Sequence, residues 1–194
     1  MYKRQVRERL GIPDGTTAVL YTPTFRDDAV FGERAFEFGL DVDAFAAALG
    51  EDHVLLLRLH YLVTEALPPP RHPSVRDVSL HPDVSELYLA ADVLVTDYSS
   101  TMFDFAVTGR PMAFLTYDLA DFQHRVRGFY FELADEAPGP LVETTSALID
   151  ALRNLDATRS SYAGRYARFR ERYCHLEDGR ATQRVLERLA QVRA

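Results

Sequence analysis

The sequence predicts an α/β fold in which a parallel sheet is flanked by helices and followed by a helical C-terminal tail. Short runs of aliphatic and β-branched residues alternate with helix-like stretches, and each run ends in polar residues, the pattern of βαβ units. From Thr144 onward only helical patterns remain. We therefore expect a single domain, with its sheet within about residues 17–143 and its C-terminal helices within about residues 144–194.

Five segments have the composition of strands. They are Thr17 to Tyr21, His53 to Leu59, Val75 to Leu80, Asp92 to Thr96 and Met112 to Thr116. The second is nearly all aliphatic, as expected for a parallel strand that is buried on both faces.

The helices between these strands are predicted from their end signals. A capping box at residues 83–86 begins a helix that ends near Ala90, and the helix of residues 101–108 is closed by Gly109. Asp41-Val42-Asp43 resembles a two-aspartate metal motif, but helix capping explains it better because an alanine-rich segment follows.

The C-terminal segment from Tyr162 to Arg193 is charged and helical. Leu186, Leu189 and Val192 form an apolar stripe along its last part, so we expect it to pack as a final helix. Asp178-Gly179 supplies the turn or cap before it.

Composition excludes several classes of protein. The chain of 194 residues has 22 basic and 29 acidic residues, so its net charge is −7. This negative charge argues against a nucleic-acid-binding protein. One cysteine, Cys174, excludes an internal disulfide framework. No apolar run approaches the roughly 20 residues of a membrane helix, and the first residues lack a signal-peptide pattern, so we expect a cytoplasmic chain.

Ligands of open parallel sheets bind beyond the carboxyl ends of the strands. The polar residues at these ends are Thr22 to Asp27, Arg58 with His60, Ser79 with His81, and Asp97 to Thr101. In the last group, hydroxyls and backbone N–H groups of Ser99, Ser100 and Thr101 stand at a helix N-terminus, an arrangement that binds phosphate. The alternative is that Ser99 is an N-cap worth about 1 kcal/mol.

Other candidates have a structural alternative as well. His60 lies on the same strand face as Arg58 and has the chemistry of a general base, although a solvated loop histidine is the commoner case. Arg26 and Arg127 have the geometry to clamp a phosphate, or they form surface ion pairs. No metal-ligand spacing and no Gly-rich nucleotide motif is present, so no metal or cofactor is expected.

Several motifs, taken in order, form a known set. They are Tyr21-Thr22-Pro23-Thr24-Phe25-Arg26-Asp27, Arg58-Leu59-His60, Asp83-Val84-Ser85-Glu86-Leu87-Tyr88, the segment of residues 91–100 that ends in Asp97-Tyr98-Ser99-Ser100, and Arg127-Gly128-Phe129-Tyr130-Phe131 with Pro138-Gly139-Pro140. This set resembles the CDP-glycerol glycerophosphotransferase family, the teichoic-acid primases and polymerases. The resemblance extends from Leu20 to Leu189.

The resemblance implies the C-terminal, Rossmann-like half of a GT-B fold that binds CDP-glycerol. It implies that Ser99, Ser100 and Thr101 hold the pyrophosphate, which Arg26 and Arg127 neutralise. Glu86 is then near the ribose, the loop from Ser79 to His81 near the cytosine, and His60 acts in the transfer. Arg58 and Asp97 complete the expected donor site.

The resemblance also implies what this chain lacks. The N-terminal domain of the family, with the polyol-phosphate acceptor side and the membrane-contacting surface, is expected to be absent. We therefore expect weak binding of CDP-glycerol or CMP, no transfer by this half alone, and membrane contact only through a full-length protein at the inner face of the plasma membrane. The alternatives are a GT-B sugar transferase, a UDP-sugar 2-epimerase, or a non-catalytic α/β interaction module.

Overall fold

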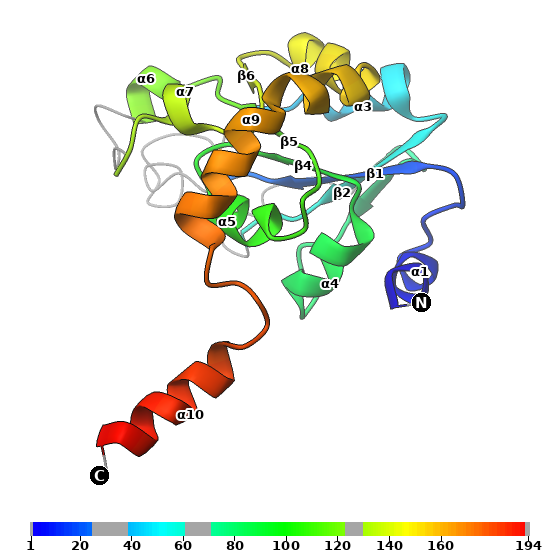
Figure 1. The fold of residues 1–194 in the computed structure, drawn as a ribbon. Helices are drawn as coiled ribbons and strands as arrows, with labels where there is room; N and C mark the ends of the chain where they lie inside the picture. Colours follow the sequence, from blue (N-terminus) through cyan, green and yellow to red (C-terminus); the bar gives the residue numbers. More distant parts are fainter. Residues whose placement is uncertain (1, 25–38, 61–70, 123–129, 193–194) are drawn as a thin grey trace, which may run out of the picture.

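Six parallel strands form the central sheet of the computed structural model, which describes residues 2–24, 39–60, 71–122 and 130–192 (Figure 1). The strands are β1 (Thr17–Thr22), β2 (His53–Leu57), β3 (Val75–Asp77), β4 (Val93–Thr96), β5 (Met112–Leu115) and β6 (Leu141–Val142). The expected α/β class is confirmed, and the two-residue strand β6 is an addition to the five predicted strands.

The strand order is β3-β2-β1-β4-β5-β6, so the chain moves outward from β1 in one direction and then returns to build the other half. This is the order of a Rossmann-like sheet, and its direction reverses between β1 and β4. Tyr21 of β1 lies opposite Leu57 of β2 and opposite Val95 of β4. The three strands therefore end at the same edge of the sheet, where a ligand crevice is expected.

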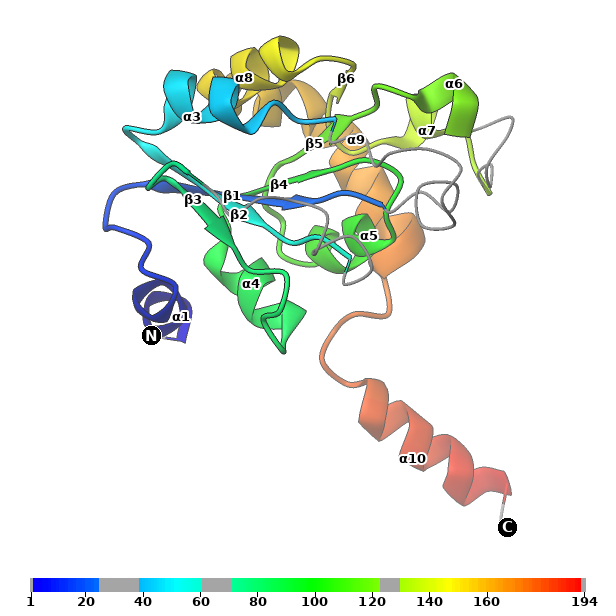
Figure 2. The same cartoon turned by 180° about the vertical axis from the view of Figure 1, so that it is seen from behind.

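Helices cover both faces of the sheet (Figures 1 and 2). One face packs against α1 (Tyr2–Arg9), α4 (Val84–Ala90) and α5 (Thr101–Ala106), and the other against α3 (Val42–Leu49) and α8 (Thr145–Arg153). The strands alternate between the two cores: Leu20, Leu56 and Leu94 face the first, and Val19, Leu55 and Val95 face the second.

The 20-residue helix α9 (Leu155–Cys174) passes from the α8 side to the α5 side of the molecule (Figure 1). Its Phe169 ring stacks on Phe103 of α5, with ring centroids 5.3 Å apart, and Tyr173 meets the same Phe103 ring edge-on. The short helices α6 (Leu119–Asp121) and α7 (Leu133–Glu136) lie between β5 and β6 along the chain.

The N-caps read from the sequence at Asp41 and Asp83 are confirmed. Glu86 does not close the predicted capping box, since its carboxylate bonds other side chains, and the helix expected over residues 101–108 ends at Ala106. Asp41 is the N-cap of α3 and accepts a hydrogen bond from the Ala44 N–H, and Asp83 caps α4 by accepting from Ser85 N–H. The second and third strands are shorter than predicted. The carboxylate of Asp77 accepts from Ser79 N–H at 2.9 Å, which turns the chain directly after β3.

The last helix, α10 (Ala181–Val192), corrects one prediction. The segment is helical, but it projects away from the body and buries none of its residues (Figure 2). Leu186, Leu189 and Val192 are 62%, 54% and 74% exposed. The 3.6-residue pattern was correct for an amphipathic helix, but the packing inferred from it was wrong because no described element lies against the stripe.

The exposed stripe predicts a sharp contrast between two leucines. Leu189→Ala should change the free energy of unfolding by no more than about 0.5 kcal/mol, because its side chain is largely in solvent. Leu148→Ala in α8, at a fully buried position, should lower it by roughly 2–5 kcal/mol. Urea unfolding of the two variants measures both values, and a loss above about 2 kcal/mol for Leu189→Ala would contradict the exposed position of α10.

Candidate functional site

Three threonine hydroxyls connect the ends of β1 and β4 with the start of α5. Thr96 Oγ1 donates to the Thr22 carbonyl oxygen at 2.7 Å, and the hydroxyls of Thr22 and Thr101 lie 2.9 Å apart. Thr22 and Thr96 are buried. These bonds hold the first turn of α5 against the sheet at the point where the strand order reverses.

Asp97 ties the loop after β1 to the loop after β4. Its carboxylate accepts from the Thr24 N–H at 2.8 Å, from the Thr24 hydroxyl at 2.7 Å and from the Tyr98 N–H at 2.6 Å. The side chain is 1% exposed. A buried carboxylate is stable only when it is hydrogen-bonded in this way, so Asp97 contacts the protein's own loops and positions them.

The segment that follows Asp97 leaves donors unpaired. Among the described residues, the backbone N–H groups of Ser99 and Ser100 and the Ser100 hydroxyl make no hydrogen bond. Ser99 is not the N-cap of α5: Ser100 occupies that position without a side-chain cap bond, and the Ser99 hydroxyl accepts from the Thr101 N–H at 3.3 Å. Ser100 is exposed and Ser99 is partly buried.

The loops after β2 and β3 are joined by Arg58 and Ser79. Arg58 donates to the backbone oxygens of Val78, Ser79 and His81 at 3.1, 2.8 and 2.5 Å, and the buried Ser79 hydroxyl accepts from the Leu59 N–H at 3.0 Å. Both predicted site residues therefore fix the two loops to each other. His60 comes directly after Leu59 in the chain and is partly buried at the same edge of the sheet.

Glu86, in the first turn of α4, is shared by three side chains. It accepts hydrogen bonds from Tyr2 and from Arg9 of α1, the latter at 2.6 Å, and its other oxygen lies 3.0 Å from His81 Nε2. These bonds lower the pKa of Glu86 to about 2. The bond from Tyr2 makes the largest contribution to this lowering, and the bond from Arg9 makes the next largest. The carboxylate thus connects α1 to the loop after β3.

The lowered pKa gives a pH dependence with a definite sign. Because the folded pKa lies below the ordinary value of 4.5, the stabilisation from ionised Glu86 is complete above about pH 4.5 and is lost as the pH falls toward 2. At pH 6 we expect the melting temperature of the wild type to be higher than that of Glu86→Gln. This difference in melting temperature should shrink as the pH falls from 4.5 to 2. Calorimetric melting temperatures check this, and a gap that stays constant down to pH 2 would contradict it.

Two predicted residues, Arg26 and Arg127, lie outside the described residues. The structure brings the other predicted residues to one edge of the sheet: His60, Arg58, Ser79, Glu86, Asp97, Ser99, Ser100 and Thr101. Sequence reasoning missed that Thr24 and Thr96 hold the site together. The sequence offers one signal for each of them: Thr24 comes shortly after β1, and Thr96 is the last residue of β4.

The chain matches a known protein family over nearly its whole length. The family model described as CDP-Glycerol:Poly(glycerophosphate) glycerophosphotransferase matches residues 2–191. The chain belongs to this family. A teichoic acid glycerol-phosphate transferase of Staphylococcus aureus is 44% identical over 188 residues, which cover 96% of this chain and 48% of the relative.

Solved structures agree with this family. The wall teichoic acid polymerase TagF superposes with a TM-score of 0.86 at 37% identity, over 98% of this chain and 46% of that one, and a variant of it has been soaked with CDPG. A UDP-GlcNAc 2-epimerase from Neisseria meningitidis, at 18% identity and a TM-score of 0.55 over 97% of this chain and 49% of its own, shares the fold alone. The chain spans about half the length of these relatives.

Two further properties concern metal binding and membrane-spanning helices. Within residues 2–24, 39–60, 71–122 and 130–192, no group of three or more His, Cys, Asp and Glu side chains is placed to hold a metal ion. No helix in the same ranges is long and apolar enough to cross a membrane.

Proposed function

We propose that this chain binds the donor of a CDP-glycerol-dependent glycerophosphotransferase of teichoic-acid synthesis. The observation that carries the proposal is the set of unpaired donors at Ser99 and Ser100, beside the point where the strand order reverses. Backbone N–H groups that converge at the start of a helix bind phosphate oxygens well. The relatives named above, which transfer or polymerise glycerol phosphate, support the choice of donor.

In the proposed site, the pyrophosphate of CDP-glycerol accepts hydrogen bonds from the N–H groups of Ser99 and Ser100 and from the Ser100 hydroxyl. Thr101 supports this segment through its contact with Thr22. Asp97 acts as a positioning residue, since its carboxylate fixes the two loops on either side of the phosphate. Arg26 and Arg127 neutralise the phosphate charge.

The nucleoside is assigned to the other side of the crevice. The loop from Ser79 to His81, fixed by Arg58, lies near the cytosine. Glu86 is assigned to the vicinity of the ribose. Its bonds to Tyr2, Arg9 and His81 hold the carboxylate ionised and in place, so a ribose hydroxyl would find a fixed acceptor there.

The proposed reaction is a transfer of glycerol phosphate. An acceptor hydroxyl attacks the phosphorus next to glycerol, the bond to the bridging oxygen breaks, and CMP leaves. His60 acts in this step, either as the base that takes the hydroxyl proton or on the phosphate. Transfer requires donor and acceptor to be held together, so the acceptor, a polyol phosphate, and any membrane contact are assigned to a longer protein of this family.

Calorimetric titration tests the proposal. The chain is titrated with CDP-glycerol, CMP and UDP-N-acetylglucosamine, and each titration is repeated with Ser99→Ala/Ser100→Ala and with His60→Ala. We expect cytidine-selective binding that the serine variant weakens and His60→Ala largely retains, because His60 is assigned to the transfer. The 194-residue chain alone should catalyse no transfer.

Each other outcome contradicts a part of the proposal. Preference for the uridine nucleotide would favour a sugar transferase or an epimerase half. No binding of any of the three nucleotides would favour an interaction module, in which the serines only support a helix. Turnover by the 194-residue chain would contradict the need for a second half.

A further inference from the structure

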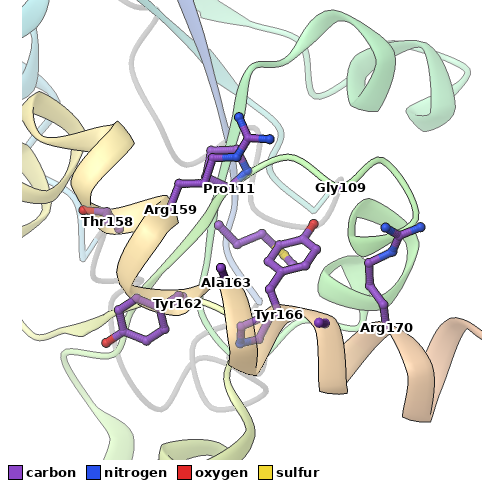
Figure 3. Close-up of a pocket in the computed structure, with 12 residues that line it drawn as sticks. Gly109, Pro111, Thr158, Arg159, Tyr162, Ala163, Tyr166 and Arg170 are labelled. Atoms are coloured by element: carbon purple, nitrogen blue, oxygen red, sulfur yellow. The ribbon is translucent and has the colours of Figure 1, made fainter.

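A cavity of about 220 Å³ lies at the edge of the sheet opposite the proposed nucleotide site. One wall is a face of α9, with Arg159, Tyr162, Tyr166 and Arg170, as Figure 3 shows. The facing wall is the backbone that enters β5 and β6, at residues 109–112 and 138–139. Because parallel strands begin at one edge and end at the other, this cavity is separate from the site at Ser99 and Ser100.

Two arginines stand at the ends of the cavity. Figure 3 shows Arg159 and Arg170 on either side of the Tyr166 ring, and α9 separates them by three turns, about 16 Å along its axis. In the part of the chain that the structure describes, neither guanidinium has a hydrogen bond or an ion pair. A third arginine nearby, Arg110, is already used, since it donates to the carbonyl oxygens at the end of α4.

The charged residues that line the cavity are both arginines. None of its lining residues is acidic. Burial raises the pKa of the Tyr166 hydroxyl, which donates to the Arg110 carbonyl oxygen at 2.7 Å, and Arg170, Arg159 and Arg110 act in the opposite direction. Unpaired guanidinium groups that line a concave surface with no acidic lining residue favour an anionic ligand.

The space between the arginines suits a small carbon body. Its walls include Pro111, Met112, Pro138 and the rings of Tyr162 and Tyr166. The volume of about 220 Å³ is below the roughly 300 Å³ of the smaller drug-sized pockets, so the cavity suits a ligand smaller than a nucleotide.

We propose that this cavity is a second anion site, which binds a small organic phosphate of the size of a polyol phosphate. The phosphate oxygens accept hydrogen bonds from Arg159 or Arg170, whose planar donor groups match phosphate geometry. The carbon chain lies against the tyrosine rings and the prolines. The proposal does not depend on the nucleotide site, because no residue is common to both.

The three methionines of the chain allow a direct test. Met112 lines the cavity, whereas Met102 lies in the first turn of α5 and its N–H donates to the Ser99 carbonyl oxygen at 3.3 Å. In the chain labelled with [13C-methyl]-methionine, glycerol 3-phosphate should shift the Met112 methyl signal saturably. Assignment uses Met112→Leu and Met102→Leu.

Arginine variants provide the controls. Arg159→Gln/Arg170→Gln should weaken the binding reported by Met112 at least about tenfold, because the two guanidinium groups are lost. Arg168→Gln, an exposed arginine of the same helix that does not line the cavity, should leave it unchanged. Melting temperatures of the three chains confirm that all are folded.

Further ligands and variants give outcomes that would overturn the proposal. Uncharged glycerol should produce no saturable shift, and inorganic phosphate should bind at least about tenfold more weakly than glycerol 3-phosphate. Equal affinity for inorganic phosphate would overturn the assignment to an organic phosphate. A shift of Met102 alone, abolished by Ser99→Ala/Ser100→Ala, would mean that the anion binds only at the nucleotide site.

Discussion

Replacing Ser100 by proline should weaken the binding of CDP-glycerol by at least about a hundredfold and leave the fold intact. Hydrogen bonds to charged groups are worth about 1.5–3 kcal/mol, and proline removes both the N–H and the hydroxyl that are assigned to the pyrophosphate. Ser100 has φ of −60°, a value that proline adopts, and its N–H makes no bond within the described part of the protein. Titration calorimetry measures the effect.

The matched control for this variant is Ser100→Ala, which removes the hydroxyl alone. It should weaken binding by less than proline does, because the backbone N–H remains. Circular dichroism should show melting temperatures close to wild type for both variants. If Ser100→Pro bound CDP-glycerol as well as wild type while folded, the phosphate would not lie at this segment.

Asp97→Ala should lower the free energy of unfolding by about 3 kcal/mol and weaken nucleotide binding as well. The variant leaves the Thr24 and Tyr98 N–H groups without their buried acceptor, and unsatisfied buried donors cost about 1–3 kcal/mol each. Asp97→Asn keeps one acceptor oxygen and should lose less. Urea unfolding gives the values.

Asp135→Ala is the control for the loss of an aspartate at an exposed position, and it should change stability by no more than about 0.5 kcal/mol. A loss below about 1 kcal/mol for Asp97→Ala would contradict its role as the link between the two loops. Full nucleotide affinity in a folded Asp97→Ala chain would contradict its positioning role.

Most strands of the sheet were predictable because they consist mainly of hydrophobic residues. His53 to Leu57 is hydrophobic along nearly its whole length, and only a strand buried on both faces requires that composition. The strand order is not contained in any one run. It depends on contacts such as that between Val19 and Val93, which are 74 residues apart.

The sequence predicted which polar residues lie together, but not the contacts that each of them makes. The polar residues that follow the strands meet at one edge of the sheet, as expected, and phosphate binding by Ser99, Ser100 and Thr101 stays a prediction. The sequence did not reveal that Asp97 contacts Thr24, because a side-chain contact between distant loops leaves no periodic pattern. The same limit applies to α10, whose pattern predicts an apolar face but not what lies against it.

The attachment of α1 constrains the order in which the chain folds during synthesis. Lys3 and Arg7 bind Asp92, and Arg9 binds Glu86, so these ion pairs join α1 to residues 77 to 89 positions further along the chain. At about 5–20 residues per second, the ribosome needs roughly 4–18 s to reach them after α1 is made. During that interval Val6, fully buried in the finished fold, lacks the part of its core that α4 supplies. α1 therefore completes its attachment to the domain only after α4 has been synthesised.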